Sequence, residues 1–539
     1  MKIRLTFLIT VFLVGMDHLQ AQYKYEPKDV LTKDFHANRR EAVRAKLSKN
    51  SVAVFFANPV RNRANDVDYV YHQDPDLYYL TGYKEPNATL LIFSEPVDIN
   101  GKQFKELFFV QPRSEQSEMW NGERLGIERT KERTGIEGVF ANDFFDDLPL
   151  DFKSFDKVLM YELKGDVRDN RNDEGDLYSM MQYFKEVTDY PEADFSETED
   201  QLYTLIETAD EYSAANVAKV IGRAMENDPS LAKNETLKAY QNASTLEERT
   251  LVVEKLPKTN IDLNQLHVIM GALREVKLEE EISMLKKAVR ISAMGQVEVM
   301  KAMHPGMSER EVQGIHEFVF KKYGAEFEGY PSIVGGGHNG CVLHYIENNK
   351  PQLTKDEMIL MDLGAEYRGY TADVTRTIPV NGKFSKEQKA IYEIVYKAQE
   401  AGIQACQVGE DFSAPYIASV KEIKEGLMKL GIIKTEADYG IYLPHGVSHH
   451  IGLDVHDKSN YSDFQENMVI TVEPGIYIPE NSPCDPKWWG IAVRIEDDIL
   501  ITSKGPVNLS EEAPRHWKEI EKVMKQESVL EKWELPVIE

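Results

Sequence analysis

Four histidines lie close together in the C-terminal half of the chain, within residues 445–457 (HGVSHHIGLDVHD). They are His445, His449, His450 and His456. Histidine is the commonest nitrogen ligand of divalent metals in proteins, but a metal site needs ligands that converge from several elements. We therefore expect this segment to form the centre of a metal site, with the remaining ligands on neighbouring elements.

Acidic residues upstream of these histidines occupy a predicted hairpin. Residues 359–365 and 371–377 have the pattern of two short strands joined by a tight turn around residues 367–369. With the turn centred there, Asp362 and Asp373 lie opposite each other and point to the same face. Directly paired antiparallel residues have Cβ atoms about 4.5–5.5 Å apart, and like charges placed so are destabilising unless they are neutralised. The pair therefore predicts a cation between the strands.

Acidic residues also follow the histidines. Residues 469–471 form an apolar strand pattern that leads directly into Glu473. Residues 492–501 alternate between apolar and polar side chains, which predicts a half-buried strand with Arg494 and Glu496 on the same face. The candidate ligands are therefore Asp362, Asp373, His449, Glu473 and Glu496.

The composition of this ligand set predicts two metal ions. Four carboxylates and one imidazole carry more negative charge than one divalent ion needs, but they suit two ions about 3.5–4 Å apart. The predominance of oxygen ligands favours Mn²⁺, with Zn²⁺, Co²⁺ and Fe²⁺ as alternatives, because ligand type alone does not decide which metal is bound.

The order and spacing of these residues resemble a known family. The pattern resembles that of the pita-bread metallopeptidases, most closely the Xaa-Pro aminopeptidases (aminopeptidase P). It consists of an Asp, a second Asp eleven residues later, a His within HGVSHHIGLDVH, a Glu within TVEPG and a Glu within RIEDD. The match extends over about residues 275–510, and residues 76–86 (DLYYLTGYKEP) resemble a string in the N-terminal domain of that family. The resemblance implies an α/β (α+β) chain, with an aminopeptidase P-like (creatinase-type) N-terminal α/β domain before a pita-bread catalytic domain, a curved antiparallel sheet backed by helices.

The chain divides into five expected parts. Residues 1–21 have a basic start, an apolar run and a small residue at Ala21, which is typical of a secretory signal peptide, so we expect an exported protein, periplasmic or secreted. Residues 22–274 form the N-terminal domain, with an acidic and helical extension over about 149–274, in which residues 200–226 and 229–255 have helical patterns. Residues 275–512 form the catalytic domain, which opens with a long amphipathic helix at 278–303, and residues 513–539 form a tail.

Composition narrows the range of partners. A formal net charge of −27 argues against nucleic acid or an anionic membrane surface, because phosphate binding needs basic patches. Beyond the leader, no apolar run approaches the ~20 residues that a membrane helix needs. Three widely spaced cysteines allow at most one disulfide bond. The glycine-rich residues 332–345 lack the lysine and hydroxyl residue of a phosphate-binding loop, so they do not predict nucleotide binding.

The resemblance also assigns roles to individual residues. It implies that Asp362 binds the first metal, that His449 and Glu473 bind the second, and that Asp373 and Glu496 bridge both.

The resemblance further implies the groups that act on the substrate. Glu473 would move the proton, and His344 and His456 would donate hydrogen bonds to the carbonyl or oxyanion of the substrate. His445 would line a proline pocket, and Arg494 would orient the carboxylates.

A tryptophan in the N-terminal domain suggests an oligomer. Trp120 lies in residues 119–126 (MWNGERLG), and in the family a tryptophan in a similar string can reach the active site of a neighbouring subunit. We therefore expect a homo-oligomer, dimer or tetramer, in which Trp120 contributes to substrate binding; ordinary packing within its own domain is the alternative.

The expected reaction is release of an N-terminal residue that precedes proline. A bond to proline is a tertiary amide without an N–H, so it needs a dedicated site. An Xaa-Pro dipeptidase (prolidase) would share the metal ligands, and creatinases share the fold but lack the full set. Some domains of this fold are non-catalytic peptide-binding modules. The intact ligand set argues against a creatinase and against a binding module, and the string at residues 76–86 favours the aminopeptidase over the dipeptidase.

Overall fold

The computed structural model describes residues 30–170, 173–188, 190, 196–210, 212–256 and 259–530. The expected leader, residues 1–21, lies outside the described residues, as does the end of the expected tail.

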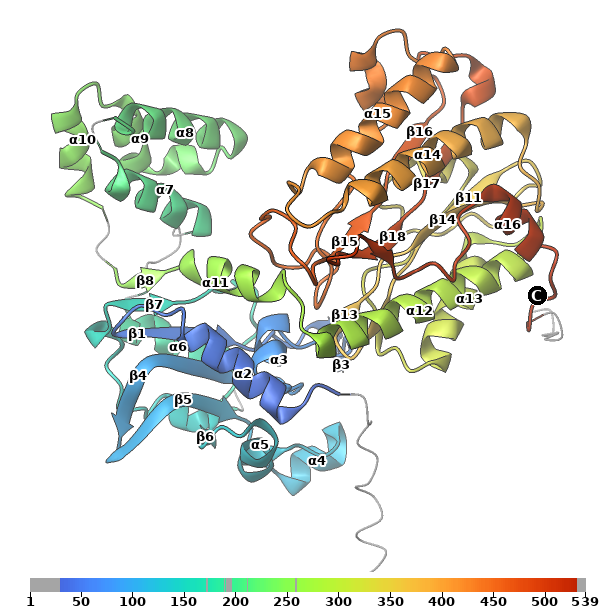
Figure 1. The fold of residues 1–539 in the computed structure, drawn as a ribbon. Coiled ribbons are helices and arrows are strands. Elements are labelled where there is room, and N and C mark those ends of the chain that lie inside the picture. Colours follow the sequence, from blue (N-terminus) through green and yellow to red (C-terminus); the bar gives the residue numbers. More distant parts are fainter. Residues whose placement is uncertain are drawn as a thin grey trace, which may run out of the picture. The chain divides into compact units, whose positions relative to one another are not determined.

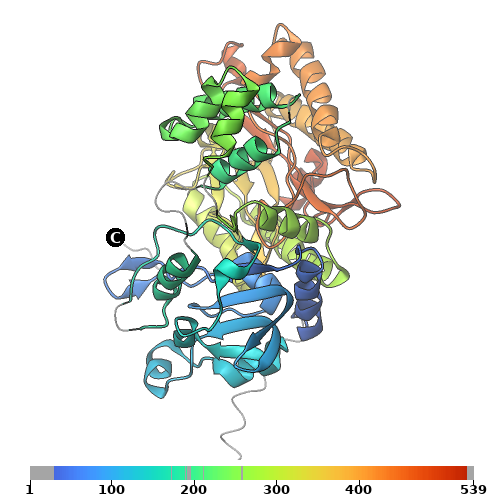
Figure 2. The ribbon, with the colours of Figure 1, turned by 90° about the vertical axis from the view of Figure 1, so that its left-hand side faces the viewer.

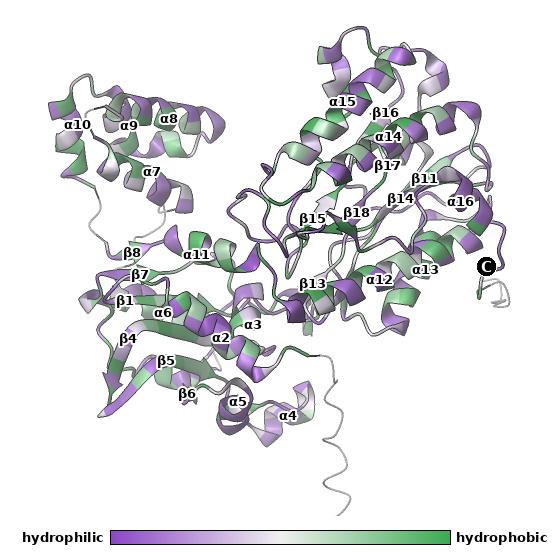
Figure 3. Ribbon diagram, in the orientation of Figure 1, coloured by the Kyte–Doolittle hydropathy of each residue, from purple (hydrophilic) through white to green (hydrophobic). Residues whose placement is uncertain are grey.

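The N-terminal part is built on a mixed six-stranded sheet with the order β6-β5-β4-β1-β7-β8 (Figure 1). Its strands are β1 (Ser51–Phe56), β4 (Thr89–Ile99), β5 (Lys102–Val110), β6 (Gly138–Ala141), β7 (Lys157–Leu159) and β8 (Ile261–Asp262). Strand β4 pairs antiparallel with β1 and β5, whereas the outer pairings are parallel. The apolar run at 51–57 thus forms an interior strand, coloured as hydrophobic in Figure 3, and nearly all of its residues are buried.

A short helix contains the string DLYYLTGY. Helix α3 (Pro75–Thr81) begins at Asp74, whose side chain accepts hydrogen bonds from the amides of Asp76 and Leu77. It ends at Gly82, which has a left-handed φ of 67°, and a Cβ there would lie 2.6 Å from His36 Nε2. Only glycine fits this position. The other elements of this part are α2 (Lys33–Arg44), β2 (Asn62–Ala64), β3 (Val67–Asp68), α4 (Glu115–Asn121), α5 (Gly126–Thr134), α6 (Leu177–Thr188) and α11 (Gln265–Arg274).

The helical extension is an insertion with its own core (Figure 2). Two long helical stretches were expected at residues 200–226 and 229–255, and the structure divides them into four α-helices. These are α7 (Glu197–Thr208), α8 (Ala214–Asn227), α9 (Glu235–Asn242) and α10 (Leu246–Val253). Their apolar faces bury one another, and a separate cluster fills the space under the sheet. The chain then returns to the sheet as β8, so this bundle interrupts the N-terminal sheet rather than extending it.

The C-terminal part consists of antiparallel hairpins backed by long helices. Every strand pair described in it is antiparallel. The helices are α12 (Glu279–Ala302), α13 (Glu309–Lys322), α14 (Lys386–Ala405), α15 (Ala414–Lys429) and α16 (Trp517–Val523). The expected helix at 278–303 is α12.

Two hairpins carry the predicted acidic ligands. The first contains β11 (Met358–Asp362), β12 (Ala365–Tyr367), β13 (Tyr370–Thr371) and β14 (Thr375–Pro379), with β10 (Ile333–Gly336) and β9 (Phe327–Glu328) alongside. The second contains β15 (Val469–Val472), β16 (Gly475–Ile478), β17 (Ile491–Arg494) and β18 (Asp497–Leu500), with β19 (Val507–Asn508) at its edge.

The register of the first hairpin differs from the expectation. The turn consists of Arg368 and Gly369, both with positive φ (54° and 85°), which is the two-residue turn that joins twisted strands best. This turn pairs Asp362 with Thr375, so the prediction that Asp362 lies directly opposite Asp373 is wrong. Because Asp373 is two residues from Thr375, it projects towards the same face and is a diagonal neighbour of Asp362.

Both hairpins are interrupted where the predicted ligands lie. The single strand expected at 492–501 is two strands, β17 and β18, separated by Ile495 and Glu496. The opposite break contains Glu473 and Pro474, and the register continues unchanged across it. At these breaks the amide of Glu473 donates to Val447 O and the amide of Glu496 donates to Thr375 O. The ligand positions therefore leave the regular ladder while their backbone amides remain bonded.

Candidate metal centre

The five predicted ligands converge in one buried cluster. Ligand atoms of Asp373, His449 and Glu496 all lie within 4.8 Å of one another. His449 Nε2 is 3.6 Å from Asp373 Oδ2 and 3.5 Å from Glu473 Oε1. Asp362 joins the group through Tyr330, whose hydroxyl contacts both Asp362 and Asp373. Residues that are up to 134 positions apart in the sequence, from 362 to 496, thus share one site.

The orientation of His449 fits a metal ligand. Its Nδ1 lies 3.1 Å from the carbonyl oxygen of His450, so this nitrogen is the protonated donor. The lone pair of Nε2 then faces the carboxylates of Asp373 and Glu473. Metal-binding histidines are commonly fixed in this way, with the second ring nitrogen bonded to a carbonyl.

The electrostatics of the cluster also fit a divalent cation. Burial, together with the neighbouring carboxylates, raises the pKa of Asp373 and of Glu496 well above the ordinary values. For Asp362, burial opposes ionisation, but Arg494 and the adjoining hydrogen bonds outweigh it and lower the pKa. Several buried carboxylates with one guanidinium among them are a site that bound cations would stabilise. The residues present therefore fit divalent metals.

A chain of hydrogen bonds links the cluster to His445. Buried Arg494 donates from Nη2 to Asp362 Oδ2 (2.5 Å) and from Nη1 to the hydroxyl of Tyr477 (2.8 Å). Tyr477 in turn lies 2.9 Å from His445 Nε2, while His445 Nδ1 contacts Gly446 O. Burial, and then Arg494, lower the pKa of His445 to about 4, so this imidazole is neutral at physiological pH. Arg494 orients a carboxylate, as expected, and also holds His445.

Two further histidines, His344 and His456, are exposed to solvent. The ring of His456 packs edge-on against His449, with 4.3 Å between the ring centroids. Burial, then the proximity of His449 and His344, lower the pKa of His456. His344 also contributes, after burial and Arg494, to the lowered pKa of His445. His344 is therefore close enough to act electrostatically on both His445 and His456.

Sequence reasoning missed two buried glutamines that hold the ligand hairpins. Gln296 of α12 donates from Nε2 to Met361 O (3.0 Å) and Val374 O (2.7 Å). These carbonyls belong to the residue before Asp362 and the residue after Asp373.

Gln399 of α14 makes the matching contacts in the second hairpin. Its Nε2 donates to Val472 O (3.1 Å), directly before Glu473, and to Asp497 Oδ2 (2.8 Å), directly after Glu496. A polar residue on the apolar face of each helix is the signal that points to these positions. Tyr330 and Tyr477 were also missed, because a tyrosine in a buried strand or loop is indistinguishable in sequence from core packing.

The string DLYYLTGY connects the N-terminal part to this site. Asp76 is fully buried and accepts from Arg274 Nη1 (2.7 Å), and Arg274 also pairs with Asp457, directly after His456. Tyr78 donates its hydroxyl to Arg368 O (2.9 Å) at the tip of the first ligand hairpin. The motif therefore holds both the histidine loop and the hairpin turn.

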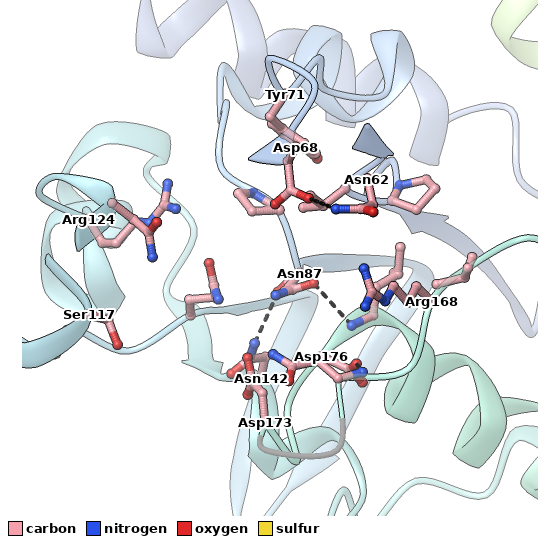
Figure 4. A pocket seen from close by; sticks show the side chains of 18 of the residues that line it. Asn62, Asp68, Tyr71, Asn87, Ser117, Arg124, Asn142, Arg168, Asp173 and Asp176 are labelled. Atoms are coloured by element: carbon pink, nitrogen blue, oxygen red, sulfur yellow. Dashed lines mark hydrogen bonds between the residues drawn. The ribbon is translucent and has the colours of Figure 1, made fainter. Parts of the chain in front are cut away.

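A separate hollow lies in the N-terminal part and contains none of the predicted metal or catalytic residues (Figure 4). It measures about 1080 Å³ and is centred on Asn87, which is bonded to Asn142 and to the amide of Leu177. Ser117 of α4 lies on its rim. On the same helix Trp120 is 82% exposed, so ordinary packing within its own domain does not account for it.

Known proteins resemble the chain along most of its length. The description "Metallopeptidase family M24" matches residues 283–503, and "Aminopeptidase P, N-terminal domain" matches residues 36–158. A Xaa-Pro aminopeptidase of Escherichia coli (strain K12) is 31% identical over 505 residues, which cover 90% of this chain and 96% of that protein. The chain belongs to the aminopeptidase P family of M24 metallopeptidases.

Solved structures of the family agree with the fold. Aminopeptidase P from E. coli with the inhibitor Pro-Leu is 29% identical, with a TM-score of 0.69 over 92% of this chain and 98% of that one. A zinc-substituted E. coli aminopeptidase P in complex with product is 28% identical, with a TM-score of 0.70 and the same coverage.

As an M24 aminopeptidase, the chain is a metal-dependent hydrolase, and the expected arrangement of an aminopeptidase P-like domain before a pita-bread domain is confirmed. Among the described residues, no helix combines the length and the apolarity required to span a bilayer.

Proposed function

We propose that this aminopeptidase uses two divalent ions to release the N-terminal residue from peptides whose second residue is proline. The convergence of Asp362, Asp373, His449, Glu473 and Glu496 in one buried cluster carries this proposal. The N-terminal aminopeptidase P-like part and a relative named Xaa-Pro aminopeptidase that matches along almost its full length support the specificity.

The geometry of His445 suits an apolar proline ring. Both of its nitrogens are already engaged, one with Gly446 and one with Tyr477, and the imidazole is neutral. It therefore offers the substrate a flat, uncharged surface. The proline ring, which has no N–H to donate, packs against such a surface without leaving a polar group unpaired.

Glu473 is placed to move the proton. When bound, the two ions would lower the pKa of a water molecule and polarise the scissile carbonyl. Glu473 directs one carboxylate oxygen towards His449 and the other towards His445 Nδ1, 3.9 Å away, so it lies between the ligand cluster and the proline surface. Its carboxylate accepts the proton of the attacking water and delivers it to the proline nitrogen, which needs a proton to leave.

His344 and His456 supply hydrogen bonds to the substrate. Both residues are exposed, His456 packs against the ligand His449, and neither is among the five ligands. A donor aimed at the developing negative oxygen stabilises the transition state more than the ground state, and the loss of one such donor typically costs about 10²–10³ in rate.

We infer that Mn²⁺ is the active ion, because four of the five ligands offer oxygen. Protein stripped of metal and reloaded with Mn²⁺, Zn²⁺, Co²⁺ or Fe²⁺ is expected to bind two ions per chain and to be most active with Mn²⁺. A stoichiometry of one ion would overturn the dinuclear proposal.

Three substrates test the proposed reaction: Gly-Pro, Gly-Pro-Ala and a longer peptide with proline in the second position. Metal-dependent release of glycine from the two longer peptides is expected, with little release when alanine replaces the proline. Cleavage of the dipeptide alone would make the enzyme a dipeptidase. Binding of all three without turnover at any metal would make it a peptide-binding module.

We also propose that Trp120 acts in a homo-oligomer, dimer or tetramer, where it reaches a neighbouring subunit's substrate site. Its 82% exposure on α4, a helix with no buried residue, leaves the side chain free for such a contact. Replacement of Trp120 by alanine should raise KM for Xaa-Pro peptides. Sedimentation showing a monomer, or an unchanged KM, would refute the idea.

We further propose that the protein is exported, to the periplasm or beyond, because its first 21 residues have the pattern of a cleaved leader. The N-terminal sequence of the mature protein, expected to begin at Gln22, checks this. Retention of residues 1–21 on the mature chain would contradict it.

A further inference from the structure

The His344 loop is the segment of residues 337–350 between β10 and β11. Its Val342 and Ile346 are 51% and 52% exposed, and His344 between them is exposed as well, whereas Tyr345 is buried. The loop thus presents its imidazole and two apolar side chains outward, while Tyr345 anchors it from beneath. A loop that must place a hydrogen-bond donor accurately needs such an anchor.

One buried carboxylate holds this loop at both ends and in the middle. Glu309, the first residue of α13, is 0% exposed. Its Oε1 accepts from the amide of Gly336 (2.7 Å) and from Asn339 Nδ2 (2.9 Å). Its Oε2 accepts from the hydroxyl of Tyr345 (2.9 Å) and the amide of Lys350 (2.8 Å).

The environment of Glu309 shows that these bonds are what stabilises its charge. Within the described part of the chain no ion pair to Glu309 is present, and the ammonium of Lys350 is directed to Glu357 instead. A buried carboxylate without a counter-ion is costly unless several donors satisfy it. All four of those donors belong to the His344 loop or to its first flanking residue, so the carboxylate is stabilised only when the loop has its observed conformation.

We propose that Glu309 is a positioning residue of the peptidase reaction, which holds the His344 loop so that His344 faces His445, His456 and the ligand cluster. The proposal rests on the proposed function, in which His344 donates a hydrogen bond to the substrate. Glu309 touches neither the cluster nor the substrate; it acts through Tyr345, the neighbour of His344.

A double-mutant cycle with His344 tests this role. Glu309→Gln leaves the shape of the side chain but replaces two acceptor positions by donors that face the Lys350 amide and the Tyr345 hydroxyl. We expect kcat to fall by about 10-fold or more, up to the roughly 10²–10³-fold limit set by loss of the donor itself, with two metals still bound. In the His344→Ala background the same substitution should lower kcat by less than about 2-fold, because the group it positions is already absent.

Glu298→Gln is the matched control. Glu298 is a buried glutamate on α12 whose Oε1 accepts from the hydroxyl of Ser528 (2.6 Å) and the amide of Val529 (2.8 Å), and none of these partners belongs to the loop. The Glu298→Gln variant loses comparable hydrogen bonds, but its kcat should stay within about 2-fold of that of the wild type.

Tyr345→Phe removes only a hydroxyl and replaces Glu309→Gln in the cycle if that variant fails to fold. Its effect on kcat should likewise be much smaller in the His344→Ala background than in the wild type. The positioning role would be overturned if Glu309→Gln, or Tyr345→Phe in its place, lowered kcat by the same factor in the wild-type and His344→Ala backgrounds. An unchanged kcat in the wild-type background would overturn it too. Absence of proline-dependent release by the wild type would instead refute the proposed function.

Discussion

Replacement of Gln296 by methionine should weaken metal binding without removing any metal ligand. Methionine has a similar length but no donor, so the carbonyls of Met361 and Val374 lose their side-chain partner. Among the described residues the glutamine oxygen meets no hydrogen-bond partner, so donation by Nε2 is what fixes the hairpin. Loss of a group that orients metal ligands typically costs about 10–100-fold in metal affinity. The two lost hydrogen bonds cost about 0.5–1.5 kcal/mol each in stability.

The assay is a calorimetric titration of metal-stripped protein with Mn²⁺, together with urea unfolding of the same samples. For Gln296→Met we expect a rise in Kd of about 10–100-fold, which is about 1.4–2.7 kcal/mol of binding free energy. The unfolding free energy should fall by about 1–3 kcal/mol, because two hydrogen bonds are lost.

Gln388→Met separates the two effects. Gln388 is also buried, donates to Asp356 O (2.9 Å) and caps α14, but it touches no residue next to a ligand. It should lose stability with an unchanged Kd. If Gln296→Met binds Mn²⁺ as tightly as Gln388→Met does, the glutamine stabilises the fold and does not position the ligands.

Three further substitutions test other parts of the structure. Glu473→Gln should lower kcat by about 10²–10⁴-fold at saturating metal, measured by steady-state release of glycine, because the amide accepts no proton. His316→Leu should make the folded protein more resistant to acid. Burial lowers the pKa of His316 to about 3, so below pH 6.5 the unfolded chain binds a proton at this residue and the folded protein does not. The stability of the wild type therefore falls as the pH drops from 6.5 towards 3. Between pH 7 and pH 4 that loss is roughly 3–4 kcal/mol at about 1.4 kcal/mol per pH unit, so urea unfolding at the two pH values should show a fall in stability that is larger in the wild type than in the variant by this amount. Asp76→Asn removes one of the buried carboxylates that pair with Arg274 and should destabilise the protein by about 3–5 kcal/mol in the same unfolding assay. A smaller loss would indicate that Asp457 alone is enough to neutralise Arg274.

The chemistry of the site was more predictable than its geometry. Carboxylates are rare in apolar strand patterns, so Asp362, Glu473 and Glu496 were candidates by residue type, and their joint order along the chain indicated a site. Their register was not, because it depends on which residues adopt positive φ in a turn. Arginine at position 368 does not predict a left-handed conformation, whereas a glycine or asparagine at that position would predict one.

Several side chains that support the site by hydrogen bonds to backbone or ligand atoms were not predicted from the sequence. Tyr330, Gln399 and Glu309 are common residue types in helices and loops, and their importance lies in which backbone atom they meet after folding. The division of the helical bundle was also missed. Helix α7 ends at Thr208 and α9 at Asn242, and the cap residues that follow, Ala209 and Ala243, favour helix, so helix propensity at these positions does not predict the ends.

The two glutamines have a consequence for the origin of the domain. Helix α12 with the first hairpin and helix α14 with the second are two versions of one unit, each made of a helix, a buried glutamine and a broken hairpin with two carboxylates. This correspondence is what duplication and fusion of a half-sized ancestor would leave. A lone unit would present two carboxylates on an open surface, and two units facing each other would present four. His449 lies outside both units, so it makes the two halves of the site unequal.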